Sequence, residues 1–569
     1  MKSRRRGIRS AAARGLAPAA HGDGPAGRAP ECDINVSPPG FLNFSLSNEY
    51  LAKNIYSLYN DFDENIKCDN LAGKTVICEF SDPNPFKVLH VGHLYTSIVG
   101  DSISRLFEYA GAKVIRANFG GDVGLHVAKT MYVLKQKDPD ELTIEDIAKC
   151  YIEGTAAYED DENAKNEITK LNKEIYQINA DGLHGRVTSL EGDPQNILRS
   201  KNSGGGNDGR TRPENKLAAL YWRGRELSYD YFNAFYKSIG VKFDKYYPES
   251  TVAALGLKTV EEQLEKGVYE KSNGAVIFNG EKFGLHTRVF INKEGVPTYE
   301  AKDVGLIFTK WKDYHFDKSV VITGSEQLDY MRVVLKSVEQ YAPELVEKTN
   351  HLIHGLVKLP GNIKMSSRKG NFLKAVDVLD MVKNELKTAY DSSDEKVSLA
   401  ATKYAFLKYK MGGDIIFDPK ESVKMTGNSG PYLLYSAVRA KKILQKAEST
   451  DAGSFSSNSR VCSPSSSRRR QNEPPVKTGG RVDLRMEEKE LAKQILEYKI
   501  VLTESVSEMA PHKVANYLYE LAQAFSRFYE NCPVIGAPEE NERLKLVKIY
   551  LDTMTHGLNI LGIEIPEEM

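Results

Sequence analysis

Residues 79–93 have the sequence Glu79-Phe-Ser-Asp-Pro-Asn-Pro-Phe-Lys-Val-Leu-His-Val-Gly-His93. They begin at the end of a short apolar run, Lys74-Thr-Val-Ile-Cys-Glu-Phe80, whose length and composition predict a buried strand. After the proline-rich turn, apolar residues at helical spacing predict a helix over His93–Tyr109, and Lys113-Val-Ile-Arg-Ala117 predicts the next strand. This order is typical of a parallel sheet with a right-handed crossover, so we predict an α/β fold.

The same pattern recurs in the second half of the chain. Strands are predicted at Val320–Thr323 and Leu352–Val357, with a helix between them after Gln327. From Val376 onward the pattern is helical to the end of the chain, apart from a weak strand signal at Asp414–Phe417, and the last helix is expected at about 542–561. The sequence therefore predicts an α/β region followed by an all-helical region.

His90-Val-Gly-His93 stands where the first strand meets its helix. We expect free N–H groups and the positive dipole at this helix N-terminus to attract phosphate oxygens. Gly92 has no Cβ and would let adenine approach the backbone. His90 and His93 are three residues apart on one helix face, where both can donate to a phosphate during its displacement. Two incidental histidines at a helix start remain the alternative for this tetrad alone.

A second motif, Lys364-Met-Ser-Ser-Arg-Lys-Gly370, lies about 270 residues later. Lys364 supplies a point charge for the β- and γ-phosphates, Ser366 and Ser367 supply hydroxyl and backbone donors, and Arg368 adds charge. Such cations stabilise a leaving pyrophosphate without a covalent nucleophile. The alternative is a solvated basic loop, which is less favoured because the histidine motif occurs in the same chain.

Together the two motifs resemble the HIGH and KMSKS signatures of class I aminoacyl-tRNA synthetases. Five further blocks are similar to the arginyl-tRNA synthetase family, namely 81–90, 296–303, 324–327, 427–435 and 559–566. The resemblance runs from about residue 40 to residue 569. One departure is Ser367, where the KMSKS loop has its second lysine. The family resemblance implies that Lys87, three residues before His90, compensates for it.

The resemblance implies a Rossmann-like parallel-sheet catalytic domain with a C-terminal all-α anticodon-binding bundle. The expected divisions are a disordered basic tail (1–38), a remnant of the N-terminal tRNA-contacting module (39–72), the catalytic domain (73–372) with a helical insertion at about 127–250, and the helical anticodon-binding domain (373–569). Two Ser- and Gly-rich segments, 182–213 and about 451–482, are expected to be disordered insertions.

The resemblance also implies an arginine–tRNA ligase, which uses ATP to form arginyl-adenylate and transfers arginine to the terminal adenosine of tRNA(Arg). The implied catalytic residues are Lys87, His90, His93 and Lys364. The implied ATP-binding residues are His90, Gly92, His93, Met365, Ser366, Ser367 and Arg368. The implied arginine-binding residues are Glu79, Asn84, His90, Tyr299, Asp303 and Gln327.

Chemistry supports several of these assignments. A guanidinium is a planar fork of five donors and requires carboxylates. Tyr299 and Asp303, one turn apart on a predicted helix, would share a face, and Glu79 ends a buried-type strand, where parallel sheets hold ligands. Asn84 and Gln327 are expected to hold the ammonium group of arginine. For Asp303 taken alone, a helix-surface acid is the alternative.

Composition limits the remaining possibilities. Lys+Arg and Asp+Glu number 77 each, so a nucleic-acid surface must be a local patch. The six cysteines show no zinc-ligand spacing, so we expect Mg²⁺ with ATP and no protein-bound zinc. No apolar run reaches the length of a membrane span, and we expect a cytoplasmic monomer. Residues 1–22 contain several arginines, much alanine and no acid, so a mitochondrial transit peptide is the alternative to a basic tail.

Two other functions remain open from the sequence. One is a catalytically weak paralogue that binds tRNA or acts as a scaffold, which the short N-terminal module and the insertions suggest. Intact Lys87, His90, His93, Asp303 and Lys364 argue against it. The other is a nucleotidyltransferase that acts without tRNA, against which the helical C-terminal third argues.

Overall fold

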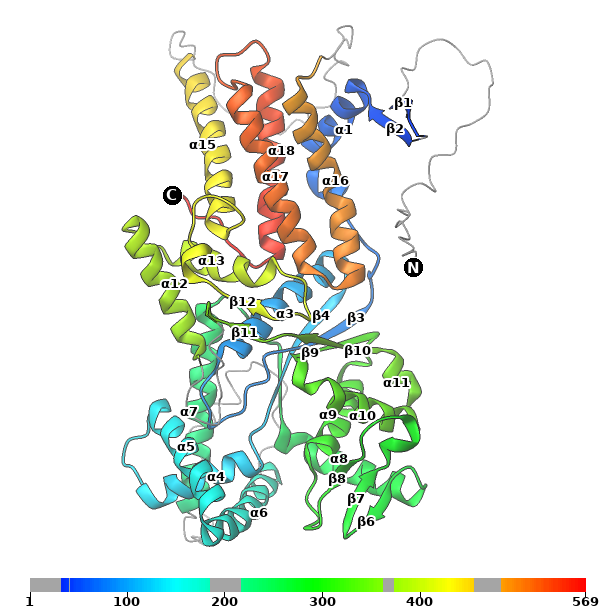
Figure 1. The fold of residues 1–569 in the computed structure, drawn as a ribbon, viewed down its shortest axis with the longest axis vertical. Coiled ribbons are helices and arrows are strands. Elements are labelled where there is room, and N and C mark those ends of the chain that lie inside the picture. Colours follow the sequence, from blue (N-terminus) through cyan, green and yellow to red (C-terminus); the bar gives the residue numbers. More distant parts are fainter. Residues whose placement is uncertain (1–31, 40, 185–215, 362–372, 455–482) are drawn as a thin grey trace, which may run out of the picture.

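The computed structural model describes residues 32–39, 41–184, 216–361, 373–454 and 483–569 (Figure 1). A twisted parallel sheet crosses the middle of the molecule. A bundle of long helices stands on one side of it, and two groups of inserted elements lie on the other side (Figure 1). The α/β class and the helical C-terminal region predicted from the sequence are both confirmed.

The central sheet consists of β3 (Thr75–Glu79), β4 (Lys113–Gly120), β5 (Lys245–Pro248), β9 (Lys318–Gly324) and β10 (Thr349–His354). All neighbours pair in parallel, in the order β10-β9-β3-β4-β5. The chain therefore winds outward from β3 in both directions, and the strand order reverses between β3 and β9. Ligands of such sheets bind beyond the carboxyl ends of the strands at this reversal. The predicted motif directly follows β3.

Helix α3 (Val91–Tyr109) joins β3 to β4 and lies between the sheet and the bundle (Figure 1). It is buried on most of its surface, which explains why its apolar pattern extends beyond one stripe. A Cβ on Gly100 would lie 2.1 Å from the ring of Phe80, so this glycine allows α3 to pack on the end of β3. On the opposite side, Ser102 Oγ donates to the carbonyl oxygen of Ile560 over 3.0 Å.

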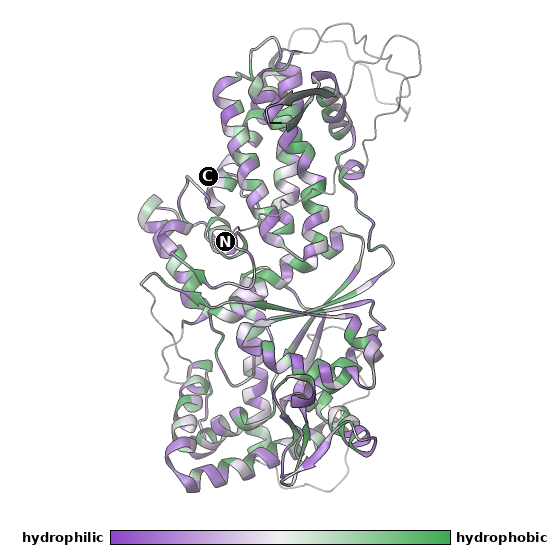
Figure 2. Cartoon of the chain, turned by 45° about the vertical axis from the view of Figure 1, so that its right-hand side comes forward, coloured by the Kyte–Doolittle hydropathy of each residue, from purple (hydrophilic) through white to green (hydrophobic). Residues whose placement is uncertain are grey.

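The C-terminal bundle contains α15 (Gly430–Ser454), α16 (Met486–Glu508), α17 (Pro511–Asn531) and α18 (Glu540–Ile560). Hydrophobic and hydrophilic residues alternate along these helices in Figure 2, as expected for helices that bury one face. Connecting elements between the sheet and the bundle are β11 (Val357–Lys358), α12 (Ala375–Tyr390), α13 (Glu395–Leu407), β12 (Ile415–Ile416) and α14 (Pro419–Ser422). The bundle and α3 share one continuous hydrophobic core.

The first insertion, between β4 and β5, is helical, as predicted. It contains α4 (Leu125–Lys137), α5 (Ile144–Asp160), α6 (Glu162–His184) and α7 (Lys216–Ser238). Its end was predicted wrongly, because residues 245–248 form β5 at the edge of the central sheet. The segment is only four residues long, and its pairing with β4 leaves no periodic signal in the sequence.

The second insertion, between β5 and β9, contains an antiparallel sheet that the sequence analysis did not predict. Its elements are α8 (Glu249–Glu265), β6 (Glu270–Ser272), β7 (Ala275–Phe278), a 3-10 turn at Gly280–Phe283, β8 (Arg288–Ile291) and α9 (Tyr299–Tyr314). A 3-10 turn at Ser325–Gln327, α10 (Leu328–Glu339) and α11 (Pro343–Glu347) connect β9 to β10. Helices α8 and α9 pack closely, since a Cβ on Gly256 would lie 1.9 Å from the carbonyl oxygen of Ala301.

The N-terminal part contains β1 (Cys32–Ser37), β2 (Phe41–Leu46), α1 (Asn48–Asn60) and α2 (Phe62–Ile66). The predicted disorder of residues 1–38 is wrong for 32–37, which pair antiparallel with β2. Residues 1–31 lie outside the described part. So do the predicted disordered segments, except 182–184 and 451–454, which belong to α6 and α15. Within the described ranges, no helix has the length and hydrophobicity needed to span a membrane.

Candidate active site

The side chains of both histidines of the first motif accept hydrogen bonds from backbone N–H groups at the start of helix α3. Nδ1 of His90 accepts the N–H of Gly92 over 3.0 Å, and Nδ1 of His93 accepts the N–H of His90 over 3.1 Å. Their ring centroids are 3.9 Å apart. In a neutral imidazole whose Nδ1 accepts, Nε2 carries the proton. Both rings therefore present an Nε2–H donor.

Electrostatics keeps both rings neutral. Desolvation and the nearby ammonium of Lys87 lower the pKa of His90 to about 4. Desolvation, with His90 and Lys87 nearby, also lowers the pKa of His93 well below its usual value. At neutral pH each ring is thus a hydrogen-bond donor without a net charge.

The expectation of free N–H groups at the start of α3 is wrong. The N–H groups of His90 and Gly92 bond to the imidazoles, that of Val91 donates to the carbonyl oxygen of Leu373 over 2.9 Å, and that of His93 bonds to the carbonyl oxygen of His90. Gly92 is required for a different reason from the one expected. A Cβ there would lie 2.8 Å from the His90 ring, which folds back over it.

The lysine motif lies outside the described residues, which end at Gly361 and resume at Leu373. Lys364, Met365, Ser366, Ser367 and Arg368 therefore all lie outside the described part of the chain. The resumed chain is hydrogen-bonded to the histidine motif, since Ala375 N–H donates to the carbonyl oxygen of Leu89 over 3.0 Å. Lys374 also forms a β-bridge with His90. The segment that follows the lysine motif thus contacts the start of α3.

Acidic side chains collect beyond the carboxyl end of β3. Glu79 is buried and accepts a hydrogen bond from Lys310 Nζ over 2.7 Å. Asp303 is 8% exposed and accepts a hydrogen bond from the Tyr330 hydroxyl. Burial, with Glu79 nearby, raises the pKa of Asp303 to about 7. Desolvation and Glu79 likewise raise the pKa of Asp82 well above its usual value.

These groups leave the site short of positive charge. Among the described residues, the buried ammonium of Lys310 pairs with Glu79 and acts on Asp82 and Asp303, and the other buried ammonium nearby, that of Lys302, pairs with Glu249. The raised pKa values of Asp82 and Asp303 mean that these two carboxylates are costly to ionise without a further cation. The site is therefore suited to a cationic guest.

The remaining predicted arginine-binding residues lie on three segments of the chain. Tyr299 is the first residue of α9 and is 48% exposed. Asp303 lies one turn further along α9, so the predicted shared helix is confirmed. Asn84 Oδ1 accepts the N–H of Gly121 over 3.0 Å. Gln327 is exposed at the end of the turn after β9.

Lys87 lies between the histidine motif and the first insertion. Its Nζ is 4.5 Å from the ring centroid of Tyr151 on α5. It also acts electrostatically on His90, His93 and His126. It is half-buried. Its charge therefore faces the site rather than open solvent.

Sequence reasoning missed Lys310, Tyr330, Asp82 and His126. Lys310 could have been found, because it lies seven residues after Asp303 on the same face of α9. Tyr330 and His126 come from α10 and α4, and their approach to α9 depends on the fold. No group of three or more metal-binding side chains occurs within the described part of the chain.

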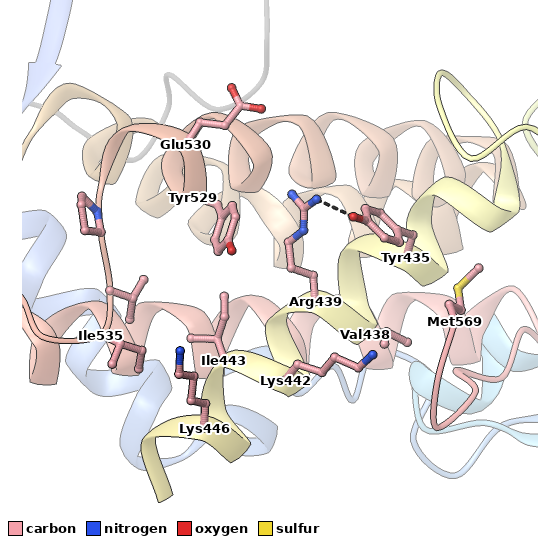
Figure 3. A pocket seen from close by; sticks show the side chains of 12 residues that line it. Tyr435, Val438, Arg439, Lys442, Ile443, Lys446, Tyr529, Glu530, Ile535 and Met569 are labelled. Carbon is pink, nitrogen blue, oxygen red and sulfur yellow. Dashed lines mark hydrogen bonds between the residues drawn. The ribbon is translucent and has the colours of Figure 1, made fainter. Parts of the chain in front are cut away.

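A second candidate site lies in the C-terminal bundle. A hollow of about 700 Å³ opens between α15, the end of α17 and the C-terminus (Figure 3). Arg439 donates to the Tyr435 hydroxyl over 2.7 Å, and its guanidinium carbon lies 4.7 Å and 4.8 Å from the ring centroids of Tyr435 and Tyr529. Lys442 and Lys446 also line it. Aromatic faces and cations together suit a nucleotide base and its phosphate.

Comparisons with known proteins identify two domains of this chain. Residues 58–417 match the family model for the catalytic domain of class I (R) tRNA synthetases, and residues 433–569 match the DALR anticodon binding domain. The chain is 28% identical to proteins named arginine–tRNA ligase from Flavobacterium psychrophilum and Treponema denticola, over 556 and 547 residues respectively. Each alignment covers 93% of this chain and 85% of the relative.

Solved structures support the fold. The arginyl-tRNA synthetase of Thermus thermophilus matches with a TM-score of 0.67 at 21% identity, covering 95% of this chain and 90% of that one. The enzyme from Plasmodium falciparum matches with a TM-score of 0.65 at 21% identity, covering 95% and 87%. Since the catalytic-domain model alone matches more than half of the residues, the chain belongs to the class I (R) tRNA synthetases.

Proposed function

We propose that this protein is an arginine–tRNA ligase that binds arginine at the acidic cluster of Glu79, Asp82 and Asp303 and activates it beside His90 and His93. The observation that carries the proposal is the excess of carboxylates over cations at the strand-order reversal. A guanidinium would supply the missing positive charge and several donors at once. Tyr299 would supply a further acceptor at the open side of the cluster.

Activation joins arginine to ATP. A carboxylate oxygen of arginine forms a bond to the α-phosphorus, and the bond from that phosphorus to the bridging oxygen breaks, releasing pyrophosphate. His90 and His93 would donate their Nε2–H groups to the phosphate, and Lys87 would stabilise charge on the same side. Lys364, Ser366, Ser367 and Arg368 would act on the β- and γ-phosphates. Mg²⁺ would accompany ATP, and no protein-bound zinc is proposed.

Transfer completes the reaction. A hydroxyl of the terminal adenosine of tRNA(Arg) attacks the arginyl carbonyl, and AMP leaves. We propose that the hollow around Tyr435, Arg439 and Tyr529 holds a base of the anticodon loop, because it lies entirely within the region that matches an anticodon-binding domain. We further propose that the protein acts as a monomer in the cytoplasm.

The test is ATP–pyrophosphate exchange with L-arginine, run with and without tRNA(Arg). L-lysine is the matched control, because it is also cationic but leaves acceptors of a guanidinium site unpaired. That mismatch costs several kcal/mol in sites built to hydrogen-bond a substrate. We expect exchange with arginine and none above background with lysine. Comparable exchange with lysine contradicts the arginine assignment.

A further inference from the structure

The turn after β4 connects two residues of the arginine site. Gly121 donates its N–H to Asn84 Oδ1 over 3.0 Å, and its carbonyl oxygen lies 2.7 Å from Nε2 of His126. Nδ1 of His126 lies 3.1 Å from the hydroxyl of Tyr299. A Cβ on Gly121 would lie 2.3 Å from Asn84 Oδ1, so only glycine allows this arrangement. Gly121 therefore holds Asn84 directly through its N–H, and it holds Tyr299 indirectly through the hydrogen bond between its carbonyl oxygen and His126.

The carbonyl of Gly121 determines which nitrogen of His126 carries the proton. A carbonyl oxygen only accepts, so Nε2 must donate to it. Burial, with Lys87 and other cations nearby, lowers the pKa of His126 well below its usual value, so the ring is neutral. Its Nδ1 then has no proton and can only accept. The Tyr299 hydroxyl must therefore donate to His126.

This direction determines what Tyr299 can offer a ligand. With its only proton engaged by His126, the phenolic oxygen meets a ligand as an acceptor. A hydroxyl that turned its proton toward the pocket would instead oppose the N–H groups of a guanidinium. Asn84 is oriented in the complementary sense. Its Oδ1 already accepts from Gly121, and its Nδ2 donates to no other residue in the described ranges, so this NH₂ group remains available as a donor to a ligand.

We propose that His126 is a positioning residue for arginine, which fixes the Tyr299 oxygen as an acceptor for the guanidinium through its bond to Gly121. The inference rests on the proposed function and deepens it. It also revises the expected role of Asn84, whose free donors suit the carboxylate of arginine better than its ammonium. His126 lies on α4 of the helical insertion and does not itself contact the substrate in this scheme.

The test compares His126→Leu with His126→Gln in arginine-dependent pyrophosphate exchange. Leucine removes both hydrogen bonds, whereas the glutamine amide again offers a donor and an acceptor side by side. We expect His126→Leu to raise the KM for arginine about tenfold, the loss of one hydrogen bond of about 1.4 kcal/mol. The KM for ATP and kcat should stay within about twofold, and His126→Gln should recover most of the arginine affinity.

Tyr299→Phe provides the second arm. If His126 acts through the phenol, adding His126→Leu to Tyr299→Phe should raise the KM no further, whereas independent effects would multiply. Should His126→Leu not fold, His126→Asn replaces it, because its shorter side chain keeps a polar group but does not reach Tyr299. Multiplying effects, or an equal loss in kcat and in ATP affinity, overturn the proposal. Exchange by the wild-type protein separates the role of His126 from the proposed function. If the wild-type protein does not exchange with arginine, the proposed function is overturned, whatever the variants show.

Discussion

Arginine affinity should weaken as the pH falls from 8 to 6, because the site must be ionised to bind a cation. Asp303 is the group with a pKa in this range, raised to about 7 by burial and by the nearby carboxylates of Glu79 and Glu249. The Tyr330 hydrogen bond and the Lys310 ammonium act in the opposite sense. Protonation removes the negative charge that pairs with the guanidinium, which keeps its own charge throughout.

The magnitude follows from the ionised fraction. With a pKa of about 7, Asp303 is about 90% ionised at pH 8 and about 10% ionised at pH 6. The apparent Kd is the intrinsic value divided by the competent fraction, so it should rise about tenfold over this range. Asp82, whose pKa is also raised, can steepen the change but not reverse it. Binding should also release about half a proton at pH 7, where Asp303 is half protonated.

Isothermal titration calorimetry with L-arginine at pH 6, 7 and 8 measures the affinity, and buffers with different ionisation enthalpies measure the released protons. Asp303→Asn is the control, because its side chain is nearly isosteric and does not titrate. It should bind arginine weakly and lose most of the pH dependence. An affinity that is flat between pH 6 and 8, or that strengthens as the pH falls, would refute the assignment of Asp303 to the guanidinium.

Three further predictions concern other parts of the catalytic domain. Lys87→Ala should lower adenylate formation at least tenfold, and Ser367→Lys should partly restore it, because both ammonium groups would serve the same anionic phosphates. Gly256→Ala should lower the free energy of unfolding by about 1–3 kcal/mol and raise the KM for arginine, because the new methyl group forces apart α8 and α9, which carries the arginine-binding residues. Lys310→Met should cost about 3–5 kcal/mol by leaving the buried carboxylate of Glu79 unpaired, and adding Glu79→Gln should recover part of that stability.

Pyrophosphate exchange checks the first of these, and denaturant unfolding checks the other two. Strict additivity of the two substitutions would show that Lys87 and position 367 have separate roles. For the helix contact, Ala254→Ser on the exposed face of α8 is the control and should change the free energy of unfolding by less than about 0.5 kcal/mol. For the ion pair, a double variant less stable than Lys310→Met would contradict the unpaired-charge argument.

Local patterns were enough to predict the elements nearest the active site. The β3–α3–β4 unit was identified because a buried strand and a helix have different periodicities, and each appears within about 20 residues. The two motifs could also be recognised from the sequence alone, because the residues of each motif are consecutive. His90 and His93 could be placed together from spacing alone, because three residues are nearly one turn.

Pairings between distant segments could not be predicted in this way. The strand at 32–37, the edge strand β5 and the strands of the sheet β6–β8 are each defined by pairing with another strand, and local periodicity does not report that pairing. Whether the N–H groups at the start of α3 are free depends on side-chain rotamers, which the sequence does not specify. In the structure the imidazoles of His90 and His93 accept hydrogen bonds from two of these groups.

The sequence by itself determined the α/β order of elements, the positions of the two motifs and the family that they resemble. Only the tertiary structure decided the charge and the hydrogen-bond direction of the site. Lys310 reaches Glu79 across 231 positions of sequence, and Tyr299 reaches His126 across 173. The pKa of Asp303 and the direction of the Tyr299 hydrogen bond follow from these contacts. Burial and neighbouring charges determine both, and neither exists until the distant segments of the chain have packed together.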